Sequence, residues 1–364
     1  ISREKIIKIE YSLEEKDVKK ERVEVEIPKQ KEPYDFEYPT EKKGKKLMSI
    51  YLGGGLNNIS GGDLNGMIKD WNEAYKDYDD YFLTADYSAD WKELKWLQNL
   101  KGEILFNLSP SFSIGLGVEY LIKKNKGDLT IDYEDSGTFD GPGYYYNVFH
   151  EANDLWEPEY KLSAIPITFN VYFFIPIDSI GEVFITGGVG FYFGRLEYNE
   201  PYEYIEEYLE DYYGDDDTYW YSWIDNYSFT ETYIYEAKCN QIGFHGGIGF
   251  DIKLLSNISL VVEGNYRYVN FKNWEGSGSD NWSWDETWGW SDLGYSEDSG
   301  SGSESWEEGK IWYWEYNDSD TEKQYKRIFL LEEEPEVSEE IKNVRQAEIN
   351  LNGFSLRLGI RFSF

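Results

Sequence analysis

Apolar and non-apolar positions alternate without a break at the C-terminal end of the chain. The segment FSLRLGIRFSF places a large apolar residue at every second position from Phe354 to Phe364, with Ser, Arg or Gly between them. Successive side chains of a β-strand point to opposite faces, so this pattern predicts a strand with one apolar and one non-apolar face. What each face contacts decides the kind of protein.

Comparable segments recur along the chain and predict about eight strands. They cover residues 46–58, 96–108, 112–122, 160–175, 182–198, 233–254, 258–271 and 347–364. Short turns at 109–111, 176–181 and 256–257 alternate with long connections at 59–95, 123–159, 199–232 and 272–346. We therefore predict an all-β fold over residues 46–364. It is a closed antiparallel up-and-down barrel, with short turns at one end and long acidic, aromatic loops at the other.

The composition of the non-apolar face indicates which face points outward. That face is rich in glycine, which suits the crowded interior of an eight-stranded barrel. It also carries charges of both signs, which we predict to form a lumen charge cluster: Glu103, Glu119, Glu263, Arg267, Arg357 and Arg361. Pairing would offset the cost of burying these charges. The apolar face then points to lipid or to a neighbouring subunit; the alternative is a soluble barrel with an apolar core.

These features together resemble one family of membrane proteins. The strand pattern, the turn rhythm and the terminal Phe364 are similar to those of the small eight-stranded outer-membrane barrels of the OmpA-like and OmpW-like kind. The resemblance covers residues 46–364 and is one of fold. It implies outer-membrane lipid as the surroundings and recognition of the last strand by the outer-membrane assembly machinery. Members of the family anchor, adhere or pass small molecules, so the resemblance names no single function.

The composition narrows the partners and the compartment. A formal net charge of -35 repels nucleic acid and leaves cationic partners, divalent cations or solubility as its uses. Cys239 is the only cysteine, so the chain forms no internal disulfide. The most apolar stretch, residues 164–177, is too short for a membrane-spanning helix. The sequence begins at Ile1, which we interpret as a processed chain whose signal peptide has been removed, placed in the bacterial outer membrane or outside the cell.

The long connections carry most of the tryptophan and much of the acidity. Tryptophan and tyrosine among Asp, Ser and Gly are typical of adaptable binding surfaces. We predict a loop interaction surface that contains Trp220, Trp223, Trp282, Trp284, Trp288, Trp290, Trp312 and Trp314. Such a surface stacks on sugars, binds cations or packs against copies of the same protein. The first connection also shows a weak helical pattern between Asp63 and Phe82, which predicts a short surface helix.

Signals for catalysis and for metal binding are weak. His150 lies in a connection, where some outer-membrane barrels place a catalytic His with Ser and an acid, but no serine is marked as its partner. The acidic stretch EDYYGDDD lacks the alternating ligands of an EF-hand loop, which favours a solvated loop over a calcium site. We therefore predict no enzyme activity, no cofactor and no metal site.

Residues 1–45 form a charged N-terminal extension with two alternating segments, Ile6–Leu13 and Arg22–Ile27. We interpret them as a tether or a self-paired hairpin, or as the means of self-association with a neighbouring copy. The predicted function is a structural or adhesive protein of the cell surface. One alternative is a self-assembling barrel subunit of an extracellular filament or tube. Another is a narrow conduit for small hydrophobic molecules.

Overall fold

The computed structural model describes residues 46–77, 85–177, 180–214, 216–318 and 323–364. The predicted N-terminal segments Ile6–Leu13 and Arg22–Ile27 lie outside the described residues. Within the described residues the chain forms seventeen strands and one helix, and every strand pairing is antiparallel. The prediction of an all-β antiparallel fold is confirmed, whereas the strand number of about eight is wrong for the chain as a whole.

All eight strands predicted from the alternation are present. They are β1 (Met48–Asn58), β3 (Trp96–Ser109), β4 (Phe112–Lys126), β7 (Glu159–Ile177), β8 (Gly181–Gly214), β9 (Tyr219–Lys253), β10 (Ile258–Tyr268) and β17 (Gly353–Ser363). Each pairs with the next in the order β1, β3, β4, β7, β8, β9, β10, β17, and β17 pairs back with β1. In β17, the positions predicted to be apolar and outward are exposed, at 65% for Leu356 and 57% for Leu358, while Arg357 and Arg361 are buried.

The additional strands are β2 (Ala85–Ala89), β5 (Leu129–Gly141), β6 (Tyr144–Trp156), β11 (Asn270–Phe271), β12 (Glu275–Trp290), β13 (Gly294–Asn317), β14 (Gln324–Leu331), β15 (Ile341–Gln346) and β16 (Ile349–Asn350). Most of them lie in segments predicted from the sequence to be loops, whereas β11 and β16 are short pieces at the ends of the predicted strands 258–271 and 347–364. In addition, β8 and β9 continue as one ladder from Gly181↔Ile252 to Tyr213↔Tyr219. Tyr, Trp, Thr and Ile favour the extended backbone of a strand. In these segments their preference decides the structure, although the acidic residues between them would also be well solvated in a loop.

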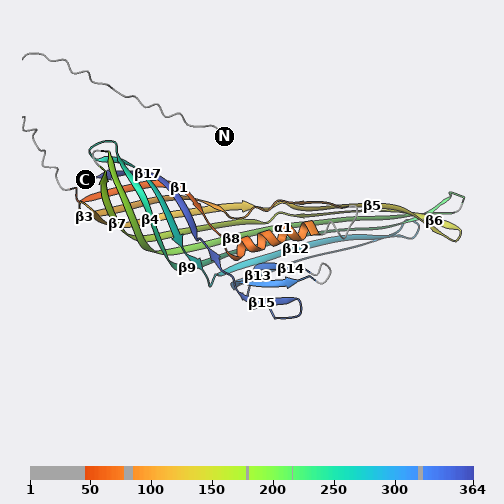
Figure 1. Cartoon of the computed structure of the whole chain (residues 1–364). Coiled ribbons are helices and arrows are strands. Elements are labelled where there is room, and N and C mark those ends of the chain that lie inside the picture. Colours follow the sequence, from red (N-terminus) through yellow and green to blue (C-terminus); the bar gives the residue numbers. More distant parts are fainter. Residues whose placement is uncertain (1–45, 78–84, 178–179, 215, 319–322) are drawn as a thin grey trace, which may run out of the picture. The chain divides into compact units, whose positions relative to one another are not determined.

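These strands build an extension of the sheet beyond the eight ring-paired strands. Within it, β6 and β5 follow β8 on one side, and β12 and β13 follow β9 on the other. Figure 1 shows β8 and β9 continuing past the region of β1, β4 and β17, with β5, β6 and β12 alongside them. We call this part the extension sheet. It occupies segments that the sequence predicted to be long acidic, aromatic loops.

The predicted helix in the first connection is confirmed as α1 (Asp63–Asp77). It contacts β14 and β2, the two ends of the strand order in the large sheet. One face of α1 is fully buried through Leu64, Met67 and Ile68, so it is a packing element as well as a surface helix. These three residues belong to an apolar cluster, the helix core, that continues through Leu97, Leu121 and Tyr192 into the ring-paired strands.

Candidate functional site

The six residues of the predicted lumen charge cluster are all buried, and each lies on one of the ring-paired strands. Arg267 and Arg357 both pair with Glu119, and Arg357 also lies 3.4 Å from Glu263. The structure therefore brings four of the six into one network. Because each charge has a partner of opposite sign, the network can persist away from bulk water.

The other two residues of the cluster have partners that the sequence analysis did not assign to it. Glu103 pairs with Lys101 at 2.8 Å and accepts a hydrogen bond from the Tyr172 hydroxyl at 2.6 Å. Arg361 pairs with Asp251. The inward position of Lys101 follows from the same alternation that places Glu103 inside, so this signal was present in the sequence.

Two apolar clusters lie along the same inward faces as the charges. One consists of Tyr51, Leu105, Tyr172, Phe174, Phe184 and Val261. The other is the helix core, which reaches the inward faces of β3, β4 and β8 through Leu97, Leu121 and Tyr192. The interior of the ring-paired strands is thus occupied by side chains throughout.

A second candidate site is the face of the extension sheet that continues the inward face of the ring-paired strands. Tyr204, Tyr208 and Tyr212 lie four residues apart on β8, and Glu206 and Glu210 lie between them on the same face. The hydroxyl of Tyr204 donates to Glu206 at 2.8 Å, and that of Tyr212 donates to Glu210 at 2.6 Å. Aromatic rings and carboxylates therefore form a column along the strand, in which Tyr204–Glu206 is one hydrogen-bonded group and Tyr208–Glu210–Tyr212 is the next.

The strand register extends this column into a grid across the sheet. Glu210 lies opposite Trp223 of β9, which in turn lies opposite Trp290 of β12. Residues directly opposite one another share a face, so Trp223, Trp282, Trp284, Trp288 and Trp290 lie on the same face as the Tyr–Glu column. We call it the aromatic acidic face. Five of the eight predicted tryptophans thus share one surface.

The other three predicted tryptophans lie elsewhere. Trp220 lies at the start of β9, with its ring centroid 6.2 Å from that of Tyr144. Trp312 and Trp314 belong to the part of β13 that pairs with β14 and β15 instead of β12. Trp312 is buried, so it does not belong to an exposed surface.

Two of the tryptophan rings lie directly against glycines of the neighbouring strand. A side chain at Gly302 would meet the ring of Trp282, and one at Gly300 would meet the ring of Trp284. The absence of a Cβ at these two positions of β13 lets each indole cover the strand. The result is a pair of partly exposed ring faces that are held in place before any ligand arrives.

Three carboxyl groups at the base of the aromatic acidic face hold protons unusually strongly. Burial raises the pKa of Glu200 to about 7 and that of Asp154 to about 6. Burial, together with repulsion by Asp280, raises the pKa of Glu231 to about 7. This part of the face therefore changes its charge near neutral pH, whereas carboxylates at their ordinary pKa values are already ionised there.

His150 lies within this face on β6. Its Nε2 atom is 2.8 Å from Glu206 Oε1, and its ring packs edge-on against Tyr133 and Tyr208. The sequence marks no serine as a partner of His150, and in the structure its partner is a carboxylate and its neighbours are aromatic. Among the described residues, no group of three His, Cys, Asp or Glu side chains is arranged to hold a metal ion.

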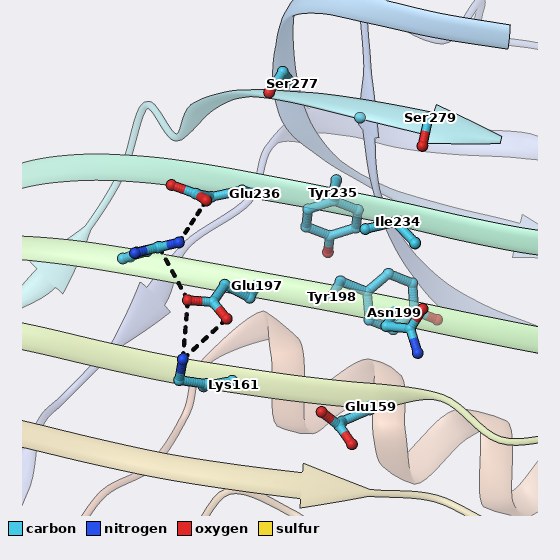
Figure 2. A pocket seen from close by; sticks show the side chains of 12 residues that line it. Glu159, Lys161, Glu197, Tyr198, Asn199, Ile234, Tyr235, Glu236, Ser277 and Ser279 are labelled. Carbon is cyan, nitrogen blue, oxygen red and sulfur yellow. Dashed lines mark hydrogen bonds and ion pairs between the residues drawn. The ribbon is translucent and has the colours of Figure 1, made fainter.

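Two hollows lie near the junction of the ring-paired strands and the extension sheet. The first, of about 470 Å³, is lined in part by Glu159, Lys161, Arg195, Glu197 and Glu236. Lys161 and Arg195 each lie 3.0 Å from Glu197, and Arg195 lies 2.6 Å from Glu236. Figure 2 shows the contact between Lys161 and Glu197. We call this first hollow the paired-charge hollow. The second, of about 540 Å³, is lined by Lys69, Lys76, Lys92, Lys95 and Lys123 among others, and we call it the lysine hollow.

Comparison with known proteins gives similarity of structure only. No family model and no curated protein matches the sequence. The structure is similar to the crystal structure of the outer membrane protease OmpT from Escherichia coli, at 10% identity and a TM-score of 0.30, covering 88% of this chain and 97% of that one. It is also similar to a major outer membrane protein from Thermus thermophilus, at 13% identity and a TM-score of 0.25, covering 87% and 99%.

These neighbours bear on two predictions. Both are outer-membrane proteins, in line with the resemblance to outer-membrane barrels at that general level. The prediction that the protein is not an enzyme is contradicted, because one neighbour is a protease. At 10% identity, that protease assigns no catalytic residue and no substrate to this chain. Among the described residues, no helix has the length and apolar character needed to cross a membrane.

Proposed function

We propose that the protein is an outer-membrane β-barrel that presents the aromatic acidic face as a binding surface outside the membrane. One observation carries the proposal. The eight ring-paired strands expose apolar side chains on one side and bury ion-paired charges on the other. A protein that folds in water has the opposite distribution.

The pairing pattern supports a closed barrel. The ring from β1 through β17 and back to β1 leaves no free strand edge among these eight strands. A closed sheet satisfies its own backbone hydrogen bonds, which the hydrocarbon core of a bilayer requires. Eight is also the smallest strand number usual for such barrels.

The outer surface of these strands supports contact with lipid. Leu100, Leu116, Phe169, Ile248 and Leu358 lie on five different strands, and each exposes between 49% and 68% of its surface. Together with their neighbours they form a continuous apolar belt, far larger than the isolated apolar residues of a soluble surface. Lipid is the partner that covers such a belt around its whole circumference.

The filled interior supports an anchoring role more than transport. The charge network and the two apolar clusters occupy the inward faces of the ring-paired strands. An eight-stranded barrel has room for little besides its own side chains. We therefore favour the binding surface over a conduit for small hydrophobic molecules.

The chemistry of the aromatic acidic face favours cationic partners. Carboxylates attract positive charge, and the faces of Trp and Tyr rings stabilise it further. The extension sheet and its helix already use such contacts internally: the guanidinium of Arg327 lies 3.8 Å from the centre of the Trp71 ring, and that of Arg345 lies 4.0 Å from the Tyr313 ring. We infer that external ligands bind by the same combination of charge and ring contact.

A binding experiment tests this proposal. The full chain in detergent micelles is titrated with poly-L-lysine and, separately, with neutral dextran, and tryptophan fluorescence reports binding. We expect poly-L-lysine to bind and Trp282→Ala/Trp284→Ala to weaken its binding about fivefold or more, since a cation stacked on a ring gains about 0.5–2 kcal/mol at each ring. Trp314→Ala, outside the face, is the matched control. Tighter binding of dextran, or equal losses in both variants, would contradict the proposed surface.

A further inference from the structure

One strand of the extension sheet has a long free edge. From Gly294 to Lys310, β13 pairs with β12 on one side, whereas β14 and β15 pair with β13 only from Lys310 onwards. Within the part of the chain that the structure describes, residues 294–309 therefore have no strand on their second side. The backbone N–H and C=O groups that point to that side can pair with another extended chain.

This edge lacks two residue types that commonly block such pairing. Proline and lysine are frequent on the edge strands of sheets, where they prevent the addition of further strands. Residues 294–309 contain neither. Their middle part, SGSGS at residues 299–303, carries only small side chains, and its three serines are exposed. No bulky side chain of this stretch keeps another strand away.

The charge of the region selects the kind of strand. On the aromatic acidic face, Asp298 lies opposite Glu286, and Glu304 lies opposite Asp280. Residues 275–309 contain no lysine or arginine. The ion pairs of the described residues include none of these four carboxylates. A second copy of β13 would bring like charges together, which disfavours pairing, whereas a basic strand is attracted.

Two aromatic rings reach the same edge. Trp282 lies opposite Gly302 and Trp284 lies opposite Gly300, and each ring lies against its glycine. Because β13 has no side chain at these two positions, the indoles of β12 extend over it. A strand added beyond β13 would lie about 4.8 Å away, which brings its alternate side chains close to the rings. A cationic side chain there meets both a carboxylate and a ring face.

We propose that the free edge of β13 binds an extended cationic peptide as an additional strand. The peptide backbone pairs with residues 294–306, and lysine or arginine at every second position faces Asp298, Glu304 and the two indoles. This inference rests on the proposed function and adds how the cationic partner is held. Backbone pairing supplies affinity, and the alternation of basic side chains supplies selectivity.

The test compares two peptides of equal charge, titrated against the full chain in detergent micelles and followed by fluorescence anisotropy. The first alternates lysine and threonine over twelve residues, so that a strand places every lysine on one face. The second has the same sequence with methylated backbone nitrogens at its four central residues, so that both of its edges lose N–H donors. We expect the first peptide to bind at least tenfold more tightly.

The outcomes separate this inference from the proposed function. Equal binding of the two peptides would overturn strand addition and leave a cation-binding surface in place. Binding of poly-L-lysine without binding of either peptide would have the same consequence. Failure of all three to bind would overturn the proposed function, and this inference with it.

Two double variants locate the edge. Asp298→Asn/Glu304→Gln removes two carboxylates beside the added strand and should weaken binding of the first peptide about threefold or more. Glu134→Gln/Asp140→Asn removes the same charge from β5, where residues 134–141 also pair on one side only within the described chain. This control should change binding by less than twofold. Equal losses in the two variants would overturn the β13 site in favour of a net-charge effect.

Hydrogen exchange of the full chain measures the pairing itself. Backbone amides at a free edge exchange with solvent more readily than those inside a sheet. The first peptide should slow exchange at residues 294–306 and leave residues 134–141 unchanged. Unchanged exchange at 294–306 despite binding would overturn strand addition. Slow exchange there before any peptide is added, together with dimers in size-exclusion chromatography, would assign the edge to a second copy and overturn the peptide as its partner.

Discussion

Individual residues of this protein show how burial sets protonation. Glu200 lies on β8, where its carboxylate accepts a hydrogen bond from the Tyr198 hydroxyl. Loss of hydration outweighs this bond and raises the pKa of Glu200 from 4.5 to about 7. The folded protein therefore holds a proton between about pH 4.5 and pH 7 that the unfolded chain releases.

This difference predicts how stability depends on pH. Where the folded state binds more protons, the free energy of unfolding falls as pH rises, so stability should fall between about pH 4.5 and 7 and level off above. Glu200→Gln keeps a hydrogen-bond acceptor but has no charge to titrate. The variant should therefore lose part of this pH dependence, which amounts to at most about 3 kcal/mol in the free energy of unfolding over the whole range. Glu231 and Asp154, whose pKa values burial also raises, contribute the rest. Urea titrations of tryptophan fluorescence at several pH values measure this, and a variant with an unchanged slope contradicts the assignment.

At the scale of secondary-structure elements, α1 determines whether the extension sheet holds together. The helix contacts β2 and β14, the two ends of the large sheet. Leu64, Met67 and Ile68 bury one side of α1 within the helix core. Since the helix joins the two ends of the sheet, its packing contributes to the stability of every strand between them.

Truncating one of these residues should therefore weaken the extension sheet before it weakens the barrel. Leu64→Ala should cost about 2–5 kcal/mol, because it leaves a cavity at a fully buried position. Met67→Leu, which conserves volume, should cost less than about 1.5 kcal/mol. Limited proteolysis should cut Leu64→Ala within residues 129–156 while the ring-paired strands stay protected. Equal protection of both variants and the unmodified protein would show that α1 does not hold the sheet.

The elements also show what the sequence could and could not predict. Alternation from Phe354 to Phe364 predicted β17 and the facing of Arg357, because a period of two is a local property. The extension sheet was missed because residues 199–232 were judged by their acidity, although Tyr204, Tyr208 and Tyr212 already fall on even positions. The pairing of Arg361 with Asp251 depends on which strands are neighbours, and a single sequence does not show that.

At the scale of the whole molecule, the residues that the structure describes between 46 and 364 combine an apolar belt, a filled interior and the extension sheet. The interior charges are paired and the inward faces carry apolar clusters as well. An aqueous path would need to displace these side chains. The protein is therefore expected to remain closed to ions.

Conductance measurements test the closed interior. Purified protein in planar bilayers should pass little current, because an eight-stranded barrel filled by side chains leaves no continuous channel. Glu263→Ala leaves Arg357 without one of its partners and should raise the frequency of brief openings. Stable, large conductance from the unmodified protein would contradict the filled interior and support the conduit.

The central claim is that the apolar face of the ring-paired strands contacts lipid. Spin labels placed one at a time at residues 354–358, 360 and 361 of a Cys239→Ser protein in bilayers test it most directly, by collision with oxygen, which concentrates in lipid, and with a water-soluble nickel chelate. Labels at Phe354, Leu356, Leu358 and Ile360 should collide with oxygen, and labels at Ser355, Arg357 and Arg361 should be shielded from both reagents. Access of the nickel chelate to the first set, with oxygen access at the second, would contradict the account.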